Sequence, residues 1–350
     1  MKLILPCGGE SSRFPGTRPK WLLTQPNGNL MVCDAITMLD LSRVDSVVLI
    51  ASEKNIQGNE ESLRNAFRGV GCEKNLEIFT LSEQTRSQPA TVAAYLRSCD
   101  EDFPFFIKDC DGQFDCVIEP KNEVVTADIE MITGNSASSK SYCRLNEHSE
   151  VTAIVEKQVI SQDFCVGGYS FKSSRQFLDS YTEISHLENL YISHVIDNLM
   201  LSMNVKFNAK RCSSYEDWGT LQDWLSYKST FRTLFVDIDG VLVKNSSEHF
   251  DPKWGTTEAI TKNVKHLMDL RSNGRTQIIL TTARSEKFSN QTEKQLKECG
   301  IEYDSIVYGL LHSKRLVIND FSKTNPYPSC EAYNVPRDSE MLGEIVRGTK

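Results

Sequence analysis

Short apolar runs of strand length alternate with helix-like segments along the first 225 or so residues, and this alternation constrains the fold most strongly. The runs at residues 2–6, 46–51, 76–81 and 104–109 are rich in Val, Ile, Leu and Phe, as β-strands are. Residues 90–99 carry apolar side chains at helical spacing. Such alternation is typical of βαβ units, so we expect a doubly wound α/β domain with a mostly parallel sheet.

A second α/β segment begins near residue 231. Its strand-like runs are residues 231–237, 276–282 and 315–320, and its helical patterns cover residues 258–274 and 289–300. A less regular, strand-rich region at about 128–171 and an apolar-faced helix at 190–202 precede it. The join falls in residues 225–232. We therefore predict two doubly wound α/β domains, residues 1–227 and a smaller one at 228–350.

The composition limits the partners that we expect. The 350 residues carry a formal net charge of −8, which argues against a general nucleic-acid binder, because phosphate backbones attract basic surfaces. No apolar run approaches the roughly 18 residues of a membrane span, so no membrane insertion is expected. The run "LILP" reads as a first strand rather than a secretory signal. Eleven cysteines without a C-x-x-C pair favour reduced thiols and a cytoplasmic protein.

A glycine-rich turn directly follows the first predicted strand. Backbone N–H groups in such a turn can bind a phosphate, although neither G-x-G-x-x-G nor a Walker lysine is present. Arg13 and Lys20 follow the turn. The run "GGESSRFPGTRPKWLL" resembles the signature of the sugar-phosphate nucleotidyltransferases, with Ser11 where that family usually has a glycine. The resemblance implies a Rossmann-like nucleotidyltransferase fold and a nucleotide-binding loop made of Gly8, Gly9, Glu10, Ser11 and Ser12.

Further segments resemble the same family, in the order that it requires. "QTRSQPATVAAYL" resembles the base-recognition turn and helix, "FIKDCDGQF" and "YEDWGTLQDW" the two metal motifs, and "VEKQVISQDFCVGGYSF" the acceptor segment. The resemblance therefore implies nucleobase contacts from Gln84, Gln88 and Ala90, Mg²⁺ ligands at Asp111 and Asp217, and acceptor contacts from Glu156, Lys157, Gly168 and Tyr169.

The chemistry explains why these residue types are needed. An oxygen of the acceptor phosphate attacks the α-phosphorus of a nucleoside triphosphate, and pyrophosphate leaves. Both reactants are polyanions, so cations must offset their repulsion and align them. By resemblance, Arg13 would hold the β- and γ-phosphates, Lys20 the α-phosphate and Lys157 the acceptor phosphate, while Mg²⁺ binds carboxylate oxygens.

Two carboxylates also end the first strand of the second segment, in "LFVDIDGVLV". A common strand-end turn would explain Asp and Gly alone, but strand alternation places Asp237 and Asp239 on one side of the backbone. The pattern resembles the first motif of haloacid-dehalogenase-type phosphatases. Thr282 in "IILTTAR", and Lys314 and Asp320 in "HSKRLVINDF", resemble the later motifs.

That second resemblance implies a role for each residue. Asp237 would be the nucleophile that forms an aspartyl phosphate, and Asp239 would protonate the leaving oxygen and then activate water. Thr282 and Lys314 would stabilise phosphoryl oxygens, with Arg315 next to Lys314 as an alternative. Asp237, Asp239 (through its carbonyl) and Asp320 would hold Mg²⁺. Asn319 stands where many relatives have a second aspartate.

The spacing of the second set of motifs leaves no room for a cap domain. The intervals between Asp239 and Thr282 and between Thr282 and Lys314 are largely filled by the predicted helices and strands. Capless members of that family act on large substrates or borrow a lid, which here could come from the N-terminal domain or from a second subunit of a homo-oligomer.

Together the resemblances imply a bifunctional enzyme. It would join a nucleoside triphosphate, with CTP preferred over UTP or dTTP, to a phosphorylated sugar or polyol for capsule or surface-polysaccharide synthesis, and would hydrolyse a phosphomonoester. Two alternatives remain. In a phosphatase whose N-terminal domain only binds a nucleotide sugar, mutation of Asp111 leaves the activity unchanged. A non-catalytic sensor would have little need of both Asp237 and Asp239.

Overall fold

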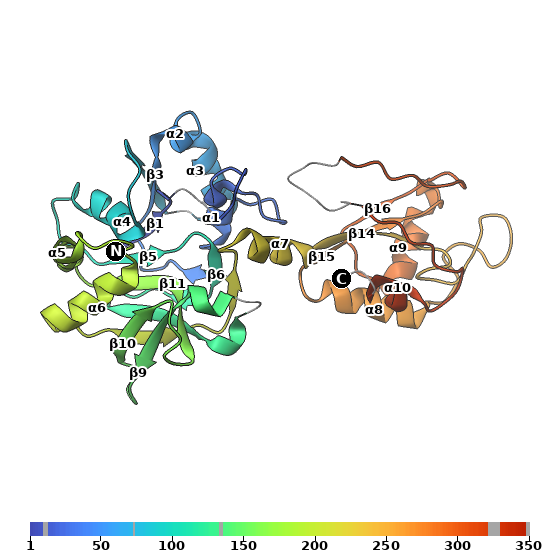
Figure 1. Ribbon diagram of the computed structural model, residues 1–350. Helices are drawn as coiled ribbons and strands as arrows, with labels where there is room; N and C mark the ends of the chain where they lie inside the picture. The colour runs from blue at the N-terminus through green and yellow to red at the C-terminus, as the bar shows by residue number, and fades with distance from the viewer. Residues whose placement is uncertain (10–12, 73, 133–135, 321–329, 348–350) are drawn as a thin grey trace. The chain divides into compact units, whose positions relative to one another are not determined.

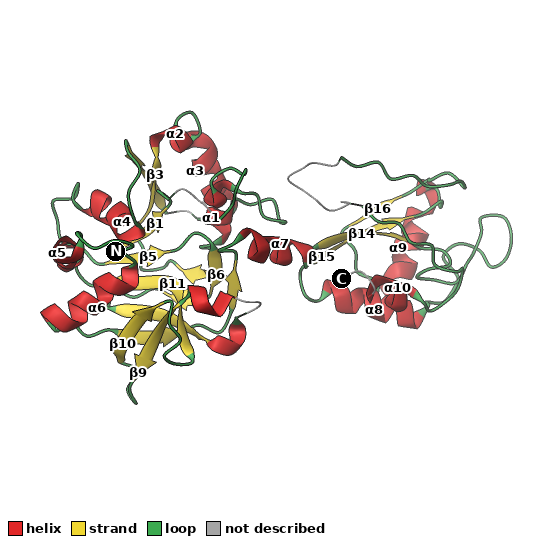
Figure 2. Cartoon of the chain, viewed as in Figure 1, coloured by secondary structure: helices red, strands yellow, loops and turns green. Residues whose placement is uncertain are grey.

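The chain folds into two compact units, Met1–Lys228 and Ser229–Lys350. The computed structural model describes residues 1–9, 13–72, 74–132, 136–320 and 330–347 (Figure 1). No helix within these residues is long and apolar enough to cross a membrane. Each unit has its own sheet and its own core (Figure 2).

The first unit contains four parallel strands in the order β5-β1-β3-β4. They are β1 (Lys2–Pro6), β3 (Ser46–Ser52), β4 (Asn75–Leu81) and β5 (Phe105–Lys108), so the four strands predicted here are confirmed. Helix α3 (Glu60–Gly69) connects β3 to β4, and α4 (Gln88–Leu96) connects β4 to β5. These are the predicted βαβ connections, and they bring the carboxyl ends of the strands to one edge of the sheet.

Most strand pairs in the rest of this sheet are antiparallel, which corrects the expectation of a mostly parallel sheet. β11 (Asp163–Phe171) runs antiparallel to β5, β8 (Glu123–Asp128) and β9 (Ser141–Leu145), and β10 (Val151–Glu156) runs antiparallel to β9. β12 (Asn208–Arg211) is parallel to β8. No helical crossover separates β9, β10 and β11, and short connections join neighbouring strands only in antiparallel order. The sheet is therefore mixed.

The central strands β1 and β3 are buried on both faces because their residues are mostly apolar. Leu3, Leu5 and Leu49 lie in one core cluster with Leu63 and Phe67 of α3. The alternate residues, such as Ile4 and Ile50, lie in a second cluster together with apolar side chains of α4, α5 (Ser174–Ile184) and α6 (Ile192–Met203). A strand with helices on both faces reads as a continuous apolar run, as observed here.

Short strands, helices and 3₁₀ turns complete the first unit. β13 (Tyr215–Asp217) pairs with β6 (Gly112–Phe114), and β2 (Leu39–Asp40) pairs with β7 (Cys116–Val117). The other helices are α1 (Met31–Asp34), α2 (Glu53–Ile56) and α7 (Leu221–Ser229), with single 3₁₀ turns η1 (Lys20–Leu22), η2 (Ile129–Met131) and η3 (Ser136–Ser139).

The second unit has a parallel sheet in the order β14-β15-β16 within the described residues. The strands are β14 (Arg232–Asp237), β15 (Thr276–Thr281) and β16 (Ser305–Val307), and the helices are α8 (Thr261–Arg271), η4 (Glu286–Phe288), α9 (Ser289–Glu298) and α10 (Leu342–Arg347). The core contains Ile238, Leu242, Leu267, Leu280 and Leu296.

The prediction of a strand at residues 315–320 is wrong. That segment has no regular secondary structure, and β16, which the sequence pattern did not predict, is the third strand instead. Leu316, Val317 and Ile318 are 75%, 61% and 93% exposed. An apolar β-branched run resembles a buried strand in sequence, but here no described strand pairs with it.

Candidate active sites

A cavity of about 640 Å³ opens at the carboxyl ends of β1, β3 and β4. Gly8, Gly9 and Gln84 of the predicted nucleotide site line it, together with Ser52 and Lys54. Parallel α/β sheets bind ligands at this edge. The predicted loop residues Glu10, Ser11 and Ser12 lie outside the described residues.

Gly8 is fixed by close packing at the first strand end. A Cβ at this position would lie 2.8 Å from Leu81 Cδ1 and 3.0 Å from Thr91 Oγ1. Because real Cβ contacts are longer than this, a side chain at residue 8 would require Leu81 or Thr91 to shift. Glycine at residue 8 allows the backbone after β1 to lie close to both side chains.

Asp111 lies just beyond β5, between two cations. Lys20 Nζ donates to Asp111 Oδ2, and Arg13 Nη2 lies 3.8 Å from the same oxygen. Burial opposes ionisation of Asp111, but Lys20, Arg13 and Lys140 together hold its pKa well below the usual range. The structure thus brings together three of the residues predicted from sequence, and it keeps Asp111 ionised.

Asp217 lies near Asp111 because β13 pairs with β6. Asp217 is the register partner of Gly112, and the Trp218 N–H donates to the Asp111 carbonyl at 2.9 Å. The two carboxylates border one space next to Gly219. A Cβ on Gly219 would lie 3.0 Å from Asp217 Oδ1 and 3.5 Å from Asp111 Oδ2.

This pair of carboxylates fits the divalent cation that the family resemblance implies. Oxygen atoms of both side chains face a space that a single methyl group would fill, and Mg²⁺ prefers oxygen ligands and retains several waters. No group of three or more His, Cys, Asp or Glu side chains that could hold a metal is found among the described residues. Asp111 and Asp217 would therefore hold Mg²⁺ with substrate oxygens and water.

Lys140 is a further cation at this site that sequence reasoning missed. Its Nζ donates to Asp217 Oδ2 at 2.5 Å and to the Tyr215 hydroxyl at 2.8 Å. Lys140 lies between η3 and β9, in the strand-rich region that the sequence pattern resolved least. No local motif marks it, because its partner is 77 residues away.

Asp109 is a second residue of this site that was not identified from the sequence, and it binds the side chain of Gln88. The side-chain amide of Gln88, expected at the nucleobase, donates to Asp109 Oδ1. Burial and the charge of Asp111 raise the pKa of Asp109 to about 6. Burial lowers the pKa of neighbouring Lys108 to about 8. The D-x-D-G spacing of Asp109 and Asp111, repeated at Asp237 and Asp239, is a signal that could have pointed to Asp109.

The first turn of α4 positions Ala90, another residue predicted to contact the nucleobase. Ser87 is the N-cap of α4, and its Oγ accepts a hydrogen bond from the Ala90 N–H at 3.3 Å. This N–H is therefore already bonded within the helix start. Ala90 packs partly buried against the core cluster that contains Val92 and Tyr95.

The predicted acceptor residues divide into two groups. Glu156 accepts hydrogen bonds from Ser141 and Ser193, and the Lys157 ammonium contacts the Tyr191 hydroxyl and lies 4.3 Å from the centre of its ring. These two residues are accessible to a ligand.

Gly168 and Tyr169 lie within β11 instead. A Cβ on Gly168 would lie 2.5 Å from Phe114 Cζ, and Tyr169 is only 6% exposed. Their tight contacts and burial favour a role in core packing, and their contact with the acceptor stays a prediction.

In the second unit, Asp237 ends β14 and Arg315 contacts it. Arg315 Nη2 donates to Asp237 Oδ1 at 3.2 Å, and Arg315 Nη1 lies 3.4 Å from Thr281 Oγ1. Burial raises the pKa of Asp237, and Asp239 adds to the effect while Arg315 opposes it. Lys314, the predicted cation, is exposed. The structure thus places the neighbouring arginine, rather than the lysine, in contact with Asp237.

Asp239 is held by Arg284, a buried residue that the sequence analysis did not identify. Arg284 Nε donates to Asp239 Oδ2 and Arg284 Nη2 donates to Oδ1, both at 2.8 Å, while Ser246 Oγ donates to Oδ1 at 2.7 Å. The other nitrogen of Arg284 donates to Thr292 and Gln295. Arg284 is the last residue of "TTAR", so its closeness to Thr282 in sequence was the available signal.

Two further residues of the predicted phosphatase site differ in exposure. Thr282 is fully buried, and its Oγ1 accepts a hydrogen bond from the Arg284 N–H at 3.0 Å. Asp320 is exposed. The binding of Mg²⁺ by Asp237, Asp239 and Asp320 stays a prediction.

The turn after Asp239 is secured by a segment near the C-terminus. Gly240 has φ +83°, and a Cβ there would lie 2.9 Å from Arg337 Cγ. The Asp338 N–H donates to the Gly240 carbonyl at 2.8 Å, and Asp338 Oδ1 accepts from the Asn245 N–H at 2.6 Å. Residues 335–339 thus stabilise the loop that carries the second carboxylate.

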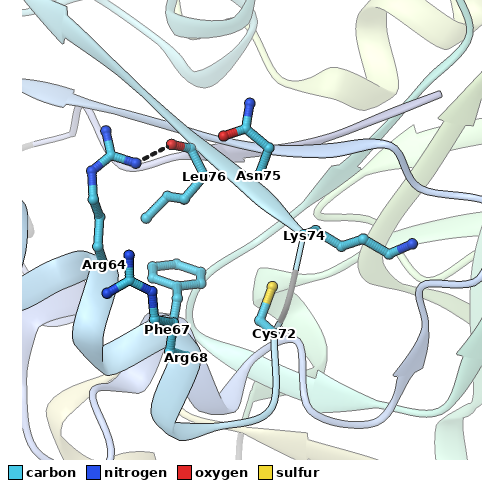
Figure 3. A pocket seen from close by; sticks show the side chains of 7 residues that line it. All are labelled: Arg64, Phe67, Arg68, Cys72, Lys74, Asn75 and Leu76. Atoms are coloured by element: carbon cyan, nitrogen blue, oxygen red, sulfur yellow. Dashed lines mark hydrogen bonds between the residues drawn. The ribbon is translucent and has the colours of Figure 1, made fainter.

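A cavity of about 390 Å³ lies elsewhere in the first unit, between α3 and β4 (Figure 3). Arg64, Arg68 and Lys74 line it beside Phe67. Arg64 is bonded to the Leu76 carbonyl, and Arg68 is bonded to Asn65. This cavity is at the amino end of β4, so it is separate from the carboxylate pair at the carboxyl ends.

Solved structures resemble the first unit. A nucleoside-diphosphate-sugar pyrophosphorylase from Vibrio cholerae RC9 superposes with a TM-score of 0.54, at 18% identity, over 64% of this chain and 98% of that protein. The first unit has the nucleotidyltransferase fold. An inositol-1-phosphate CTP transferase from T. maritima (TM-score 0.50, 14% identity, 63% and 90% covered) and a UDP-glucose pyrophosphorylase (0.50, 13%, 65% and 96%) also match. No protein-family model matches the chain, and a search of the curated proteins found no match.

Proposed function

We propose that the first unit transfers a nucleotidyl group from a nucleoside triphosphate to a phosphorylated sugar or polyol. The observation that carries this proposal is the pair Asp111 and Asp217, which border one space at the carboxyl edge of a nucleotidyltransferase-type sheet. Lys20 and Arg13 lie beside that space, next to the loop after β1. Two carboxylates for a divalent cation and two cations for phosphates are the groups that the reaction needs.

Each residue has a defined task in the proposed reaction. An oxygen of the acceptor phosphate forms a bond to the α-phosphorus, and the bond to the β-phosphate oxygen breaks with release of pyrophosphate. Mg²⁺ held by Asp111 and Asp217 supplies charge neutralisation when bound. Lys20 and Arg13 bind the triphosphate oxygens, and Lys157 beside Tyr191 binds the acceptor phosphate.

CTP is our preferred nucleotide, and the acceptor is a phosphorylated sugar or polyol. One of the similar structures is described as a CTP transferase acting on inositol-1-phosphate, and two others as pyrophosphorylases for nucleotide sugars. These descriptions support the substrate class. The proposed role is the synthesis of activated precursors for a surface or capsule polysaccharide.

We propose that the second unit is a haloacid-dehalogenase-like, capless phosphatase. Asp237 ends a parallel strand next to Arg315, as a nucleophile with a phosphoryl-binding cation would. A carboxylate oxygen of Asp237 attacks the phosphorus, and the bond to the alcohol oxygen breaks as Asp239 donates a proton to that oxygen. Asp239 then takes a proton from water, which attacks the aspartyl phosphate, releases phosphate and regenerates the Asp237 carboxylate.

The Arg284 contacts define what Asp239 can contribute. A carboxylate oxygen accepts about two hydrogen bonds. Oδ1 already accepts from Arg284 and Ser246, whereas Oδ2 accepts from Arg284 alone among the hydrogen bonds of the described residues. Oδ2 therefore has room to exchange a proton with the leaving oxygen and with the attacking water, as a general acid and base does.

One assay tests both proposals on the full-length chain. Pyrophosphate and free phosphate are measured with CTP, UTP, dTTP, ATP or GTP and a panel of sugar and polyol phosphates, with Mg²⁺. Asp111→Asn should abolish pyrophosphate release only, and Asp237→Asn phosphate release only. Asp179→Asn and Asp269→Asn, exposed residues on α5 and α8, are matched controls.

The outcomes separate the alternatives. Phosphate release without pyrophosphate from any nucleotide would identify a phosphatase whose first unit only binds nucleotide sugars. Binding of nucleotide sugars without either product would identify a sensor.

A further inference from the structure

Lys140 lies at the proposed transferase site but has no role in the reaction proposed above. Its side chain is 15% exposed and that of Asp217 is 9% exposed, so the ion pair between them is largely shielded from water. Tyr215 receives a second hydrogen bond from the same ammonium, whose nitrogen lies 5.4 Å from the centre of the Tyr215 ring. The lysine is therefore fixed by a carboxylate, a hydroxyl and a ring.

Each of the two proposed metal-binding carboxylates is paired with a lysine. Lys20 donates to Asp111, and Lys140 donates to Asp217. Each lysine binds a carboxylate oxygen, the ligand type that a divalent cation requires. Lys140 Nζ lies on Asp217 Oδ2, whereas Oδ1 of the same carboxylate faces the space proposed for the cation. An ammonium and a divalent cation on the two oxygens of one shielded carboxylate repel each other strongly, because like charges a few Å apart interact strongly there. The lysine and the metal thus compete for the Asp217 carboxylate.

Lys140 is also linked to the acceptor residues. Its carbonyl accepts a hydrogen bond from the Lys157 N–H at 3.0 Å, and the next residue, Ser141, is both the register partner and a hydrogen-bond donor of Glu156. The backbone that carries Lys140 is therefore hydrogen-bonded to the segment proposed to receive the acceptor.

We propose that Lys140 is a further substrate-binding residue: it neutralises Asp217 until a divalent cation binds there, and the released ammonium then binds the phosphate of the acceptor. This inference rests on the proposed transferase function. The ammonium of Lys140 thus binds first the Asp217 carboxylate and then the acceptor phosphate, so cation binding frees the lysine for the acceptor.

Chemical labelling of the wild-type chain tests the release directly. Lysines are acetylated briefly with N-hydroxysuccinimidyl acetate, with and without Mn²⁺ as the metal probe, and each site is quantified by mass spectrometry. Lys140 should label at least about threefold faster with Mn²⁺, because its ammonium leaves a shielded ion pair. Lys121, an exposed lysine paired with Glu119, is the internal control and should not change.

Variants test the competition independently of activity. Calorimetry with Mn²⁺ alone should show that Lys140→Met binds the cation about fivefold more tightly than wild type, because the competing ammonium is gone. Lys121→Met should match wild type. Asp217→Asn should lose the binding, which locates the cation. In turnover, Lys140→Met should raise the KM of the acceptor more than that of the nucleotide.

The inference is overturned if Mn²⁺ binds but Lys140 labelling does not rise, or if Lys140→Met has unchanged or weaker cation affinity. Absence of cation binding in the wild type also overturns it. The proposed transferase function fails by a different result, namely no pyrophosphate from any nucleotide in the wild-type chain.

Discussion

Arg284 Nε and Nη2 each donate to a different oxygen of Asp239 at 2.8 Å, although the residues are 45 positions apart in sequence. The arginine is fully buried and the aspartate side chain is 16% exposed. A bidentate arginine–carboxylate pair of this kind fixes the direction of the carboxylate.

Replacing Arg284 should therefore destabilise the second unit. Arg284→Met leaves a largely buried carboxylate without its partner, so we expect a loss of about 3–5 kcal/mol in the free energy of unfolding. Hydrogen exchange of the β14 and β15 amides, read by mass spectrometry, reports on this unit alone. Arg271→Met, which removes a more exposed pair with Asp304, should cost less than about 1 kcal/mol. Equal losses in the two variants would contradict the argument.

A methyl group at Gly219 should disrupt the proposed cation site. The Cβ of Gly219→Ala would lie 3.0 Å from Asp217 Oδ1 and 3.5 Å from Asp111 Oδ2, in the space between the carboxylates. We expect Mn²⁺ affinity to fall by about tenfold or more, since overpacking by one methyl group costs about 1–3 kcal/mol. Gly69→Ala, at the end of α3 with open space around the added atom, is the matched control. Unchanged Mn²⁺ affinity in Gly219→Ala would place the cation elsewhere.

Gly168 should prove to be a packing residue. In Gly168→Ala the new Cβ would meet Phe114 Cζ at 2.5 Å and Val125 Cγ2 at 2.9 Å, so we expect a loss of about 1–3 kcal/mol in stability. Thermal unfolding of the first unit measures it. The KM of the acceptor should be unchanged at temperatures where the variant is folded. A stable variant with a raised KM would instead restore Gly168 to the acceptor site.

The cysteines should differ sharply in reactivity. Burial raises the pKa of Cys33 and Cys116 to about 12 and that of Cys212 to about 11, so these thiols stay protonated and unreactive at pH 8. Cys330 is exposed. We expect one fast-reacting thiol with a disulfide reagent at pH 8, absent in Cys330→Ser. Fast reaction of several thiols in the native protein would contradict the described core.

Local patterns predicted much of the fold. β1, β3, β4 and β14 were recognised because apolar runs of strand length are set by neighbouring residues. The pattern failed at residues 315–320, where Leu316, Val317 and Ile318 are exposed, and at the antiparallel half of the sheet. Strand direction and partner depend on how connections return to the sheet, and apolar composition does not encode that.

The residues of the candidate sites also divide into those that the sequence predicted and those that only the structure revealed. Asp111, Asp217, Asp237 and Asp239 could be named from sequence because each stands at a strand end or beside a glycine, in a short recognisable motif. Lys140, Arg284 and Arg315 could not be assigned to their partners. The partners lie 77, 45 and 78 residues away.

The sequence by itself thus determined the α/β alternation, the division near residue 228 and the positions of the carboxylates, since these follow from periodicity and turn chemistry over a few residues. Only the tertiary structure decided which cation neutralises each carboxylate. That choice depends on strand register and loop paths that bring distant side chains within about 3 Å, the range of a charge-assisted hydrogen bond.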